Sequence, residues 1–175
     1  MKRSTTFFAT AIVLAASGSV TGAAPALPLH KPGLWQQTMT QDGVVNPNAS
    51  SQVCYDPPSE VKIAAMGDEF SSKSCPSKQV VHNPDGSWTM SGTCSFQQGW
   101  NTTSRATLSG SFDSEVTTTI DSTTNGAPAP QMNGTHRTVL VQTWLGSCKP
   151  GQRGGDVIME DGSKMNMMDE PAPQN

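Results

Sequence analysis

Four cysteines are the residues whose type and spacing most directly indicate chemistry in this chain: Cys54, Cys75, Cys94 and Cys148. They are even in number and widely spaced, and the sequence holds no C-x-x-C pair. This spacing is typical of disulfides and argues against a zinc ribbon or a thioredoxin-type redox site. The chemistry predicted for them is therefore cross-linking in an oxidising compartment.

The stretch between Cys75 and Cys94 favours one of the three pairings that four cysteines allow. Residues 83–86, Asn-Pro-Asp-Gly, form a strong turn signal between segments that suit strands. Counting outward from this turn places Cys75 opposite Cys94, at a separation that suits a disulfide. Cys54 and Cys148 are then left to each other. A one-residue bulge would spoil this register, and a Cys54–Cys75 link is the alternative.

Other residue types that do chemistry lack a recognisable arrangement. The three histidines, His30, His82 and His136, have no metal-ligand spacing, so we expect satisfied or solvent-facing side chains. No G-x-S-x-G motif marks a serine nucleophile. Asp113 and Glu115 lie two residues apart and fit a solvated strand edge better than a catalytic pair. The sequence therefore predicts no enzyme, no cofactor and no metal site.

Two further groups of residues offer binding chemistry. Thioether ligands favour Cu(I), but the methionines near the C-terminus are more simply explained as incidental; they are Met159, Met165, Met167 and Met168. The tryptophans are better candidates for ligand contacts, because small β-barrels bind apolar molecules in their mouths and interiors. Core packing is the default for each of them. The candidate ligand contacts are Trp35, Trp88 and Trp144.

The N-terminus predicts export. Residues 1–24 form a signal peptide, with Lys2 and Arg3 as the basic region and an apolar run over residues 7–16. No second apolar run follows, so we expect no transmembrane segment after signal removal and a periplasmic or secreted location. The formal net charge is −3 and no basic patch stands out, which makes nucleic acid an unfavourable partner.

The elements that must position these residues are mostly strands. We expect a lead at residues 25–31 (the N-terminal lead), a β domain at 32–148 and a mobile, Met-containing tail at 149–175. Within the domain, a helix of about ten residues starts near Asp56 and ends near Gly67, since acid and proline come early in it. Residues 135–147 form the clearest strand, which is apolar on both faces and is therefore expected to be central or to close a barrel. The strands are expected near residues 34–41, 51–55, 80–82, 88–96, 102–109, 115–124 and 135–147.

These features together predict the fold class. It is mainly β: an antiparallel meander of six to eight strands that forms an open barrel or a sandwich, with one short helix and two disulfides.

The order of motifs resembles a family of exported bacterial proteins known as domain of unknown function 3617. The matching positions are residues 32–35 (P-G-L-W), Cys54, Cys75, residues 88–94 (W-T-M-S-G-T-C) and residues 145–148 (L-G-S-C). The resemblance covers roughly residues 31–148. It implies the compartment and the architecture, and it implies no activity, because the family has none established.

Two functions remain from the sequence. The first is a non-enzymatic module that binds a small or apolar ligand on the concave side of the sheet. The alternative is an interaction or scaffold protein of the envelope that has no ligand pocket.

Overall fold

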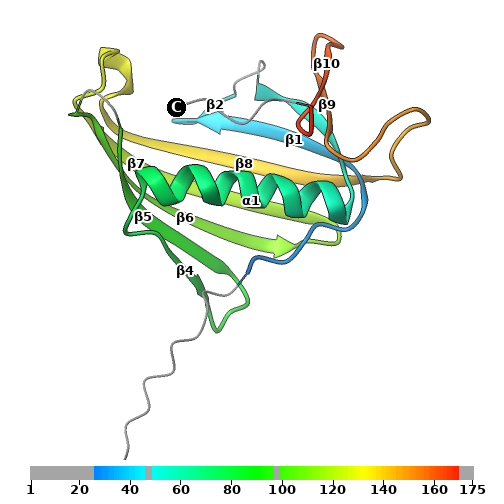
Figure 1. Cartoon of the computed structure of the whole chain (residues 1–175), viewed down its shortest axis with the longest axis horizontal. Helices are drawn as coiled ribbons and strands as arrows, with labels where there is room; N and C mark the ends of the chain where they lie inside the picture. Colours follow the sequence, from blue (N-terminus) through cyan, green and yellow to red (C-terminus); the bar gives the residue numbers. More distant parts are fainter. Residues whose placement is uncertain (1–25, 46–48, 97–98, 170–175) are drawn as a thin grey trace, which may run out of the picture.

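The protein is built on one antiparallel sheet of ten strands (Figure 1). The computed structural model describes residues 26–45, 49–96 and 99–169, so the predicted signal peptide lies outside the described residues. The strand order is β10-β9-β3-β1-β8-β7-β6-β5-β4, with β2 paired to β1. The strands are β1 (Gly33–Gln41), β2 (Val44–Val45), β3 (Ser51–Tyr55), β4 (Gln79–His82), β5 (Trp88–Ser95), β6 (Asn101–Ser111), β7 (Glu115–Asn125), β8 (Gly134–Gly146), β9 (Asp156–Met159) and β10 (Lys164–Asn166). The helices are α1 (Pro57–Ser74) and the short 3-10 turn η3 (Pro130–Met132).

The predicted fold class is confirmed. The meander β5-β6-β7-β8 pairs each strand with the next one in the sequence, and β8 lies between β1 and β7, as its apolar faces predict. The sheet is not a closed barrel, because β4 and β10 are its two edges. It has more strands than the six to eight expected, since β2, β9 and β10 come from segments that the sequence pattern does not mark as strands.

The two faces of the sheet differ because side chains alternate along each strand. Residues that pair across antiparallel strands point to the same side, so the register joins Trp88 to Leu108, Leu108 to Thr118 and Thr118 to Leu140 on one face. We call this the inner face, because α1 covers it (Figure 1). The opposite, outer face carries mostly threonine and serine over β5–β8.

The helix is longer than predicted: α1 runs through Gly67 to Ser74, where a polar connection was expected. Its start follows the prediction, with Pro57 and Pro58 in the first turn and the Asp56 carboxylate accepting from the Ser59 N–H at 2.8 Å. A glycine inside a helix costs only about 1 kcal/mol relative to alanine. A disulfide at the C-terminal cap holds the helix end to the sheet and outweighs that cost. None of the described helices is long and apolar enough to cross a membrane.

Both predicted disulfides are present, Cys75–Cys94 and Cys54–Cys148. The hairpin register behind the first is wrong by one residue, because His82 pairs with Trp88 and Val80 with Met90. Gly86 adopts a φ of 84° and lengthens the turn, so that the Asn83 N–H donates to the Ser87 carbonyl. Cys75 is not on a strand at all; it caps the C-terminus of α1.

The segment after Cys148 joins the sheet where the sequence predicted a mobile tail. Its strand β9 pairs with β3, and β10 pairs with β9. The physical reason is Asp156, whose side chain is 2% exposed and accepts from Lys164 Nζ at 2.7 Å, Asn166 Nδ2 at 2.8 Å and the Arg153 N–H at 2.9 Å. No pattern in this polar, Met-rich sequence predicts that one carboxylate is buried with its hydrogen bonds satisfied.

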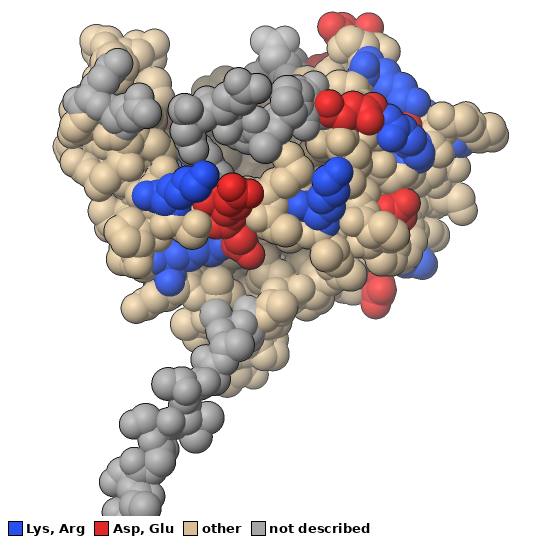
Figure 2. All heavy atoms as spheres, viewed as in Figure 1, with Lys and Arg blue, Asp and Glu red and all other residues tan. Residues whose placement is uncertain are grey.

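Charges on the helix side are interspersed (Figure 2). Two ion pairs lie there, Lys73 with Glu69 and Lys78 with Asp68. All four side chains are well exposed, so these pairs add little to stability.

Removing the long-range disulfide should cost more stability than removing the short one. Cys54 and Cys148 are 94 residues apart and Cys75 and Cys94 only 19, so the chain-entropy model gives about 5 and about 3 kcal/mol. We expect the urea midpoint to fall further for the double variant C54S/C148S than for C75S/C94S. The reverse order would show that anchoring α1 matters more than loop length.

Asp156→Asn should destabilise the protein by about 2 kcal/mol, because the amide presents donors to partners that are themselves donors. Burial raises the pKa of Asp156, but the hydrogen bonds from Asn166, Lys164 and the Arg153 N–H outweigh it and hold the pKa at about 2. A lowered folded-state pKa stabilises above the unfolded value, so this contribution is lost as pH falls from about 4 to about 2. Urea unfolding at neutral and acid pH measures it. Asp113→Asn, at an exposed position, is the matched control and should leave the stability at neutral pH unchanged.

Candidate functional site

The three tryptophans predicted to contact a ligand belong to the inner face but do not line one cavity. Trp35 is fully buried, and Trp88 is 9% exposed in a cluster with Ala106 and Leu108. Trp144 is half-buried and pairs with Trp35 across β1 and β8. Trp35 and Trp88 thus serve the interior, which is the core-packing alternative. The fourth tryptophan, Trp100, stacks on Phe96 at 4.2 Å near the β5–β6 turn.

Two of these indoles hold the chain that leads into β1. Trp35 Nε1 donates to the Lys31 carbonyl at 2.8 Å, and Trp144 Nε1 donates to the Pro32 carbonyl at 3.3 Å. The Lys31 ammonium lies 3.7 Å from the centre of the Trp144 ring, within cation–π range. Gly33 makes the approach possible, because a Cβ there would collide with the Gly146 carbonyl and the Trp144 indole. The N-terminal lead is therefore part of the domain.

His30 fixes the N-terminal lead to the helix. Its Nδ1 lies 2.6 Å from Glu60 Oε1, and its backbone N–H donates to both carboxylate oxygens at 3.0 and 3.1 Å. Because a carboxylate only accepts, the proton of this contact belongs to Nδ1. The ring stacks on Tyr55 at 4.8 Å and meets Trp35 edge-on at 4.8 Å. The Nδ1 side of the ring fits the satisfied histidine predicted from sequence, whereas Nε2 does not, and His30 was expected to lie before the domain.

Tyr55 extends this polar cluster beneath the helix. Its hydroxyl accepts from Gln37 Nε2 at 2.9 Å and lies 3.4 Å from Gln142 Nε2. Burial raises the pKa of Tyr55 to about 12; the Glu60 charge acts in the same direction, and the two amide hydrogen bonds oppose it. Tyr55 is thus a neutral phenol that packs and accepts hydrogen bonds.

The imidazole–carboxylate pair of His30 and Glu60 has the form of a general-base unit, but its surroundings do not suit catalysis. His30 Nε2 is buried and, among the described residues, has no hydrogen-bond partner. A general base must reach the proton that it removes. No group of three or more His, Cys, Asp or Glu side chains suited to a metal occurs in the described part of the chain. What the arrangement does is lock the N-terminal lead between α1 and the sheet.

The other predicted candidates are scattered. His82 stacks on Trp88 at 4.5 Å, and His136 Nδ1 lies 2.8 Å from the Asp42 carboxylate, which raises the pKa of His136 and lowers that of Asp42. Asp113 is exposed, and the Glu115 carboxylate accepts from Thr143 Oγ1 at 3.2 Å. Met165 lies opposite Val157 in the β9–β10 hairpin, with 43% of its surface exposed.

An apolar surface remains under the helix, and the N-terminal lead enters it. Leu27 packs against the cluster of Trp88, Ala106 and Leu108. Further apolar side chains of this surface are only partly buried; they are Val80, Met90, Phe112 and Ile120. Sequence reasoning missed Leu27, because a lone leucine in a proline-containing lead carries no periodic signal.

The outer face carries a polar groove of about 450 Å³ across β5–β8. Eight of its twelve lining residues are serine or threonine, and Arg105 and Asp121 are among the others. This groove was also missed, although the odd positions from 115 to 123 carry no apolar residue, which is a visible signal for one polar face.

Comparison with known proteins establishes the family. The model of the family described as "Protein of unknown function (DUF3617)" matches residues 30–148. The chain belongs to this family, as its motifs suggested, and the match takes in His30, both disulfides and α1. No curated protein and no solved structure matches the chain significantly.

Tyr55 should ionise with a midpoint near pH 12 in the folded protein and about 10 in denaturant. It is the only tyrosine, so phenolate absorbance reports it alone. Because the folded pKa is raised, its contribution to stability is complete below pH 10 and is lost as pH rises toward 12.

Glu60→Gln should lower this midpoint by removing the nearby negative charge. Glu69→Gln, on the exposed side of α1, should leave it unchanged. A midpoint near 10 in the wild-type protein, with folding verified by circular dichroism, would contradict the buried position of Tyr55.

Proposed function

We propose that this chain is an exported, non-enzymatic module that binds a small apolar molecule on the inner face of the sheet, in the place where Leu27 packs. One observation carries the proposal: beneath α1, an apolar surface of seven side chains, four of them only partly buried, packs against one leucine from a segment without regular structure. Concave, mostly apolar surfaces are where small ligands bind.

The cover over this surface is thin. Among its described side chains the helix contributes few apolar ones, with Ile63 and Met66 half-buried and Val61 56% exposed. Leu27 precedes the anchored residues of the N-terminal lead, so it can leave the surface while His30 and Lys31 stay in place. An apolar ligand would then gain contacts with side chains that are now partly exposed to water, at about 25 cal/mol per Å² buried.

Export and the absence of catalysis belong to the same proposal. All four cysteines are joined in disulfides, which persist in oxidising compartments. The basic and apolar regions of residues 1–24 favour a signal peptide. The His30–Glu60 pair itself offers no accessible base, because His30 Nε2 is buried.

A second function is favoured by a different surface. Val44 and Val45, which form β2 directly after the turn at residues 42–43, are 70% and 61% exposed. Exposed apolar residues that lie together suit a protein partner. Under this alternative the chain is an interaction module of the envelope, and the inner face is a closed core.

Leu27→Ala should strengthen the binding of dodecanoate about fivefold, because the ligand no longer has to displace a half-buried leucine worth about 1 kcal/mol. Calorimetric titration measures the affinity. Leu29→Ala is the matched control: it lies in the same segment, is 43% exposed, and should bind as the wild type does.

Failure of dodecanoate to bind either the wild type or the Leu27→Ala variant would sink the apolar-site proposal. Native mass spectra of the protein purified from its own envelope give an independent readout, with a retained ligand mass expected. A uniformly ligand-free spectrum, together with crosslinked partners lost in a V44S/V45S variant, would favour the interaction module.

A further inference from the structure

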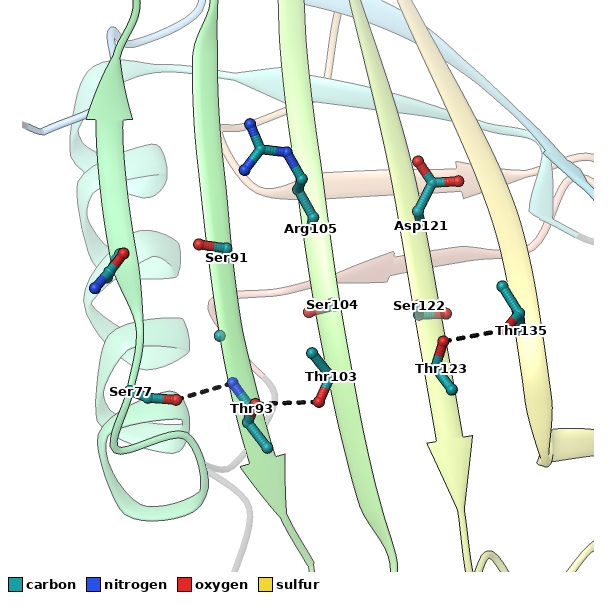
Figure 3. A pocket seen from close by; sticks show the side chains of 12 residues that line it. Ser77, Ser91, Thr93, Thr103, Ser104, Arg105, Asp121, Ser122, Thr123 and Thr135 are labelled. Carbon is teal, nitrogen blue, oxygen red and sulfur yellow. Dashed lines mark hydrogen bonds between the residues drawn. The ribbon is translucent and has the colours of Figure 1, made fainter.

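The polar groove lies on the outer face, on the opposite side of the sheet from α1 (Figure 3). Its floor is formed by β5, β6, β7 and β8, and Ser77 and Gln79 form the wall at the β4 edge. Ser77 completes this wall by accepting the Thr93 N–H at 3.0 Å, where β4 no longer pairs with β5. The groove is therefore built by five adjacent strands and is independent of the apolar surface under the helix.

Four threonines cross the groove in one row, one from each of β5, β6, β7 and β8. Thr93 pairs with Thr103, Thr103 with Thr123 and Thr123 with Thr135. Adjacent strands are about 4.8 Å apart, so the row presents hydroxyl groups at a regular interval close to the length of one sugar ring. The four hydroxyls form two hydrogen-bonded pairs: Thr93 Oγ1 lies 3.1 Å from Thr103 Oγ1, and Thr123 Oγ1 lies 3.1 Å from Thr135 Oγ1 (Figure 3).

A second row, two residues further along each strand, carries charge. Arg105, Asp121 and Arg137 are in register on β6, β7 and β8. Arg137 holds both oxygens of the Asp121 carboxylate, with Nε to Oδ1 at 2.7 Å and a terminal nitrogen to Oδ2 at 3.1 Å. Arg105 makes no ion pair within the described residues, and its guanidinium leans toward β5, away from Asp121 (Figure 3). The guanidinium of Arg105 is thus unpaired among the described residues, and it lies beside the row of threonine hydroxyls.

We propose that this groove binds an acidic carbohydrate, with a sugar carboxylate on Arg105 and the sugar hydroxyls on the threonine row. A guanidinium recognises a carboxylate through two parallel hydrogen bonds. Threonine suits a sugar ring, because it offers a hydroxyl that donates and accepts and a methyl group for the C–H face of the ring. The groove is open to solvent, so a sugar chain longer than the row of threonines can extend beyond it.

The test uses the full mature protein and three probes: trigalacturonate, the neutral trisaccharide maltotriose and inorganic phosphate. Trigalacturonate should bind, and Arg105→Gln should weaken it about tenfold, the loss of a charge-assisted hydrogen-bond pair. The double variant T103V/T123V removes two hydroxyls at exposed strand positions that valine suits, and it should weaken trigalacturonate without changing phosphate binding. Lys62→Gln, the same charge change on the far side of the sheet, is the matched control and should bind as the wild type does.

Three outcomes overturn the proposal. One is that trigalacturonate does not bind. The second is that maltotriose binds equally well, which removes the role of Arg105. The third is that Arg105→Gln weakens phosphate and trigalacturonate equally while T103V/T123V changes neither, which reduces the groove to a simple anion site. None of these results depends on dodecanoate binding under the helix, so the two proposals fail separately.

Discussion

The attachment of α1 at both ends is the constraint on which the rest of the structure depends. An open sheet leaves one apolar face uncovered, and a helix rich in serine and charged residues has little hydrophobic surface with which to cover it. Two disulfides hold the helix in position where apolar packing is weak. Cys54, two residues before the Asp56 cap, is bonded to Cys148, and Cys75 at the other end is bonded to Cys94. The helix therefore spans the inner face between two fixed points and needs few contacts along its length.

The N-terminal lead completes what the helix begins. The carbonyls of Lys31 and of the adjoining Pro32 accept from two indoles, His30 binds Glu60 on the helix, and the Lys31 N–H donates to the Phe112 carbonyl at 2.7 Å. These contacts join four parts of the molecule that are distant in the sequence: α1, β1, β8 and the β6–β7 turn. These contacts fix residues 30–32 in place, whereas Leu27 is held only by apolar contact. A segment that is fixed at residues 30–32 and weakly attached at Leu27 can release Leu27 from the apolar surface without detaching from the domain.

Local sequence signals predicted what local physics decides. The alternation of residues 135–147 predicts a central strand, and β8 is one; the turn at residues 83–86 brings Cys94 near Cys75 even though the register differs by one residue. The missed features depend on partners far along the chain. Helix α1 continues past Gly67 because its end is cross-linked to β5, and β9 joins the sheet because Asp156 finds Lys164 and Asn166. The tryptophans were correctly placed on strands, but their hydrogen bonds to the N-terminal lead had no sequence signal.

Alternation along each strand gives the sheet an apolar inner face and an outer face of hydroxyl groups. Because the inward-facing and outward-facing side chains belong to the same strands, neither set can change its register without the other. Thr103 and Arg105 point outward from β6, while Ala106 and Leu108 on the same strand point inward to Trp88 and Leu27. A shift of one residue in the pairing of β6 would exchange these sets and bury a guanidinium. The burial of the inner cluster thus fixes the register, and the register aligns the four threonines into a row. In this protein the packing of one face determines the chemistry that the other face can offer.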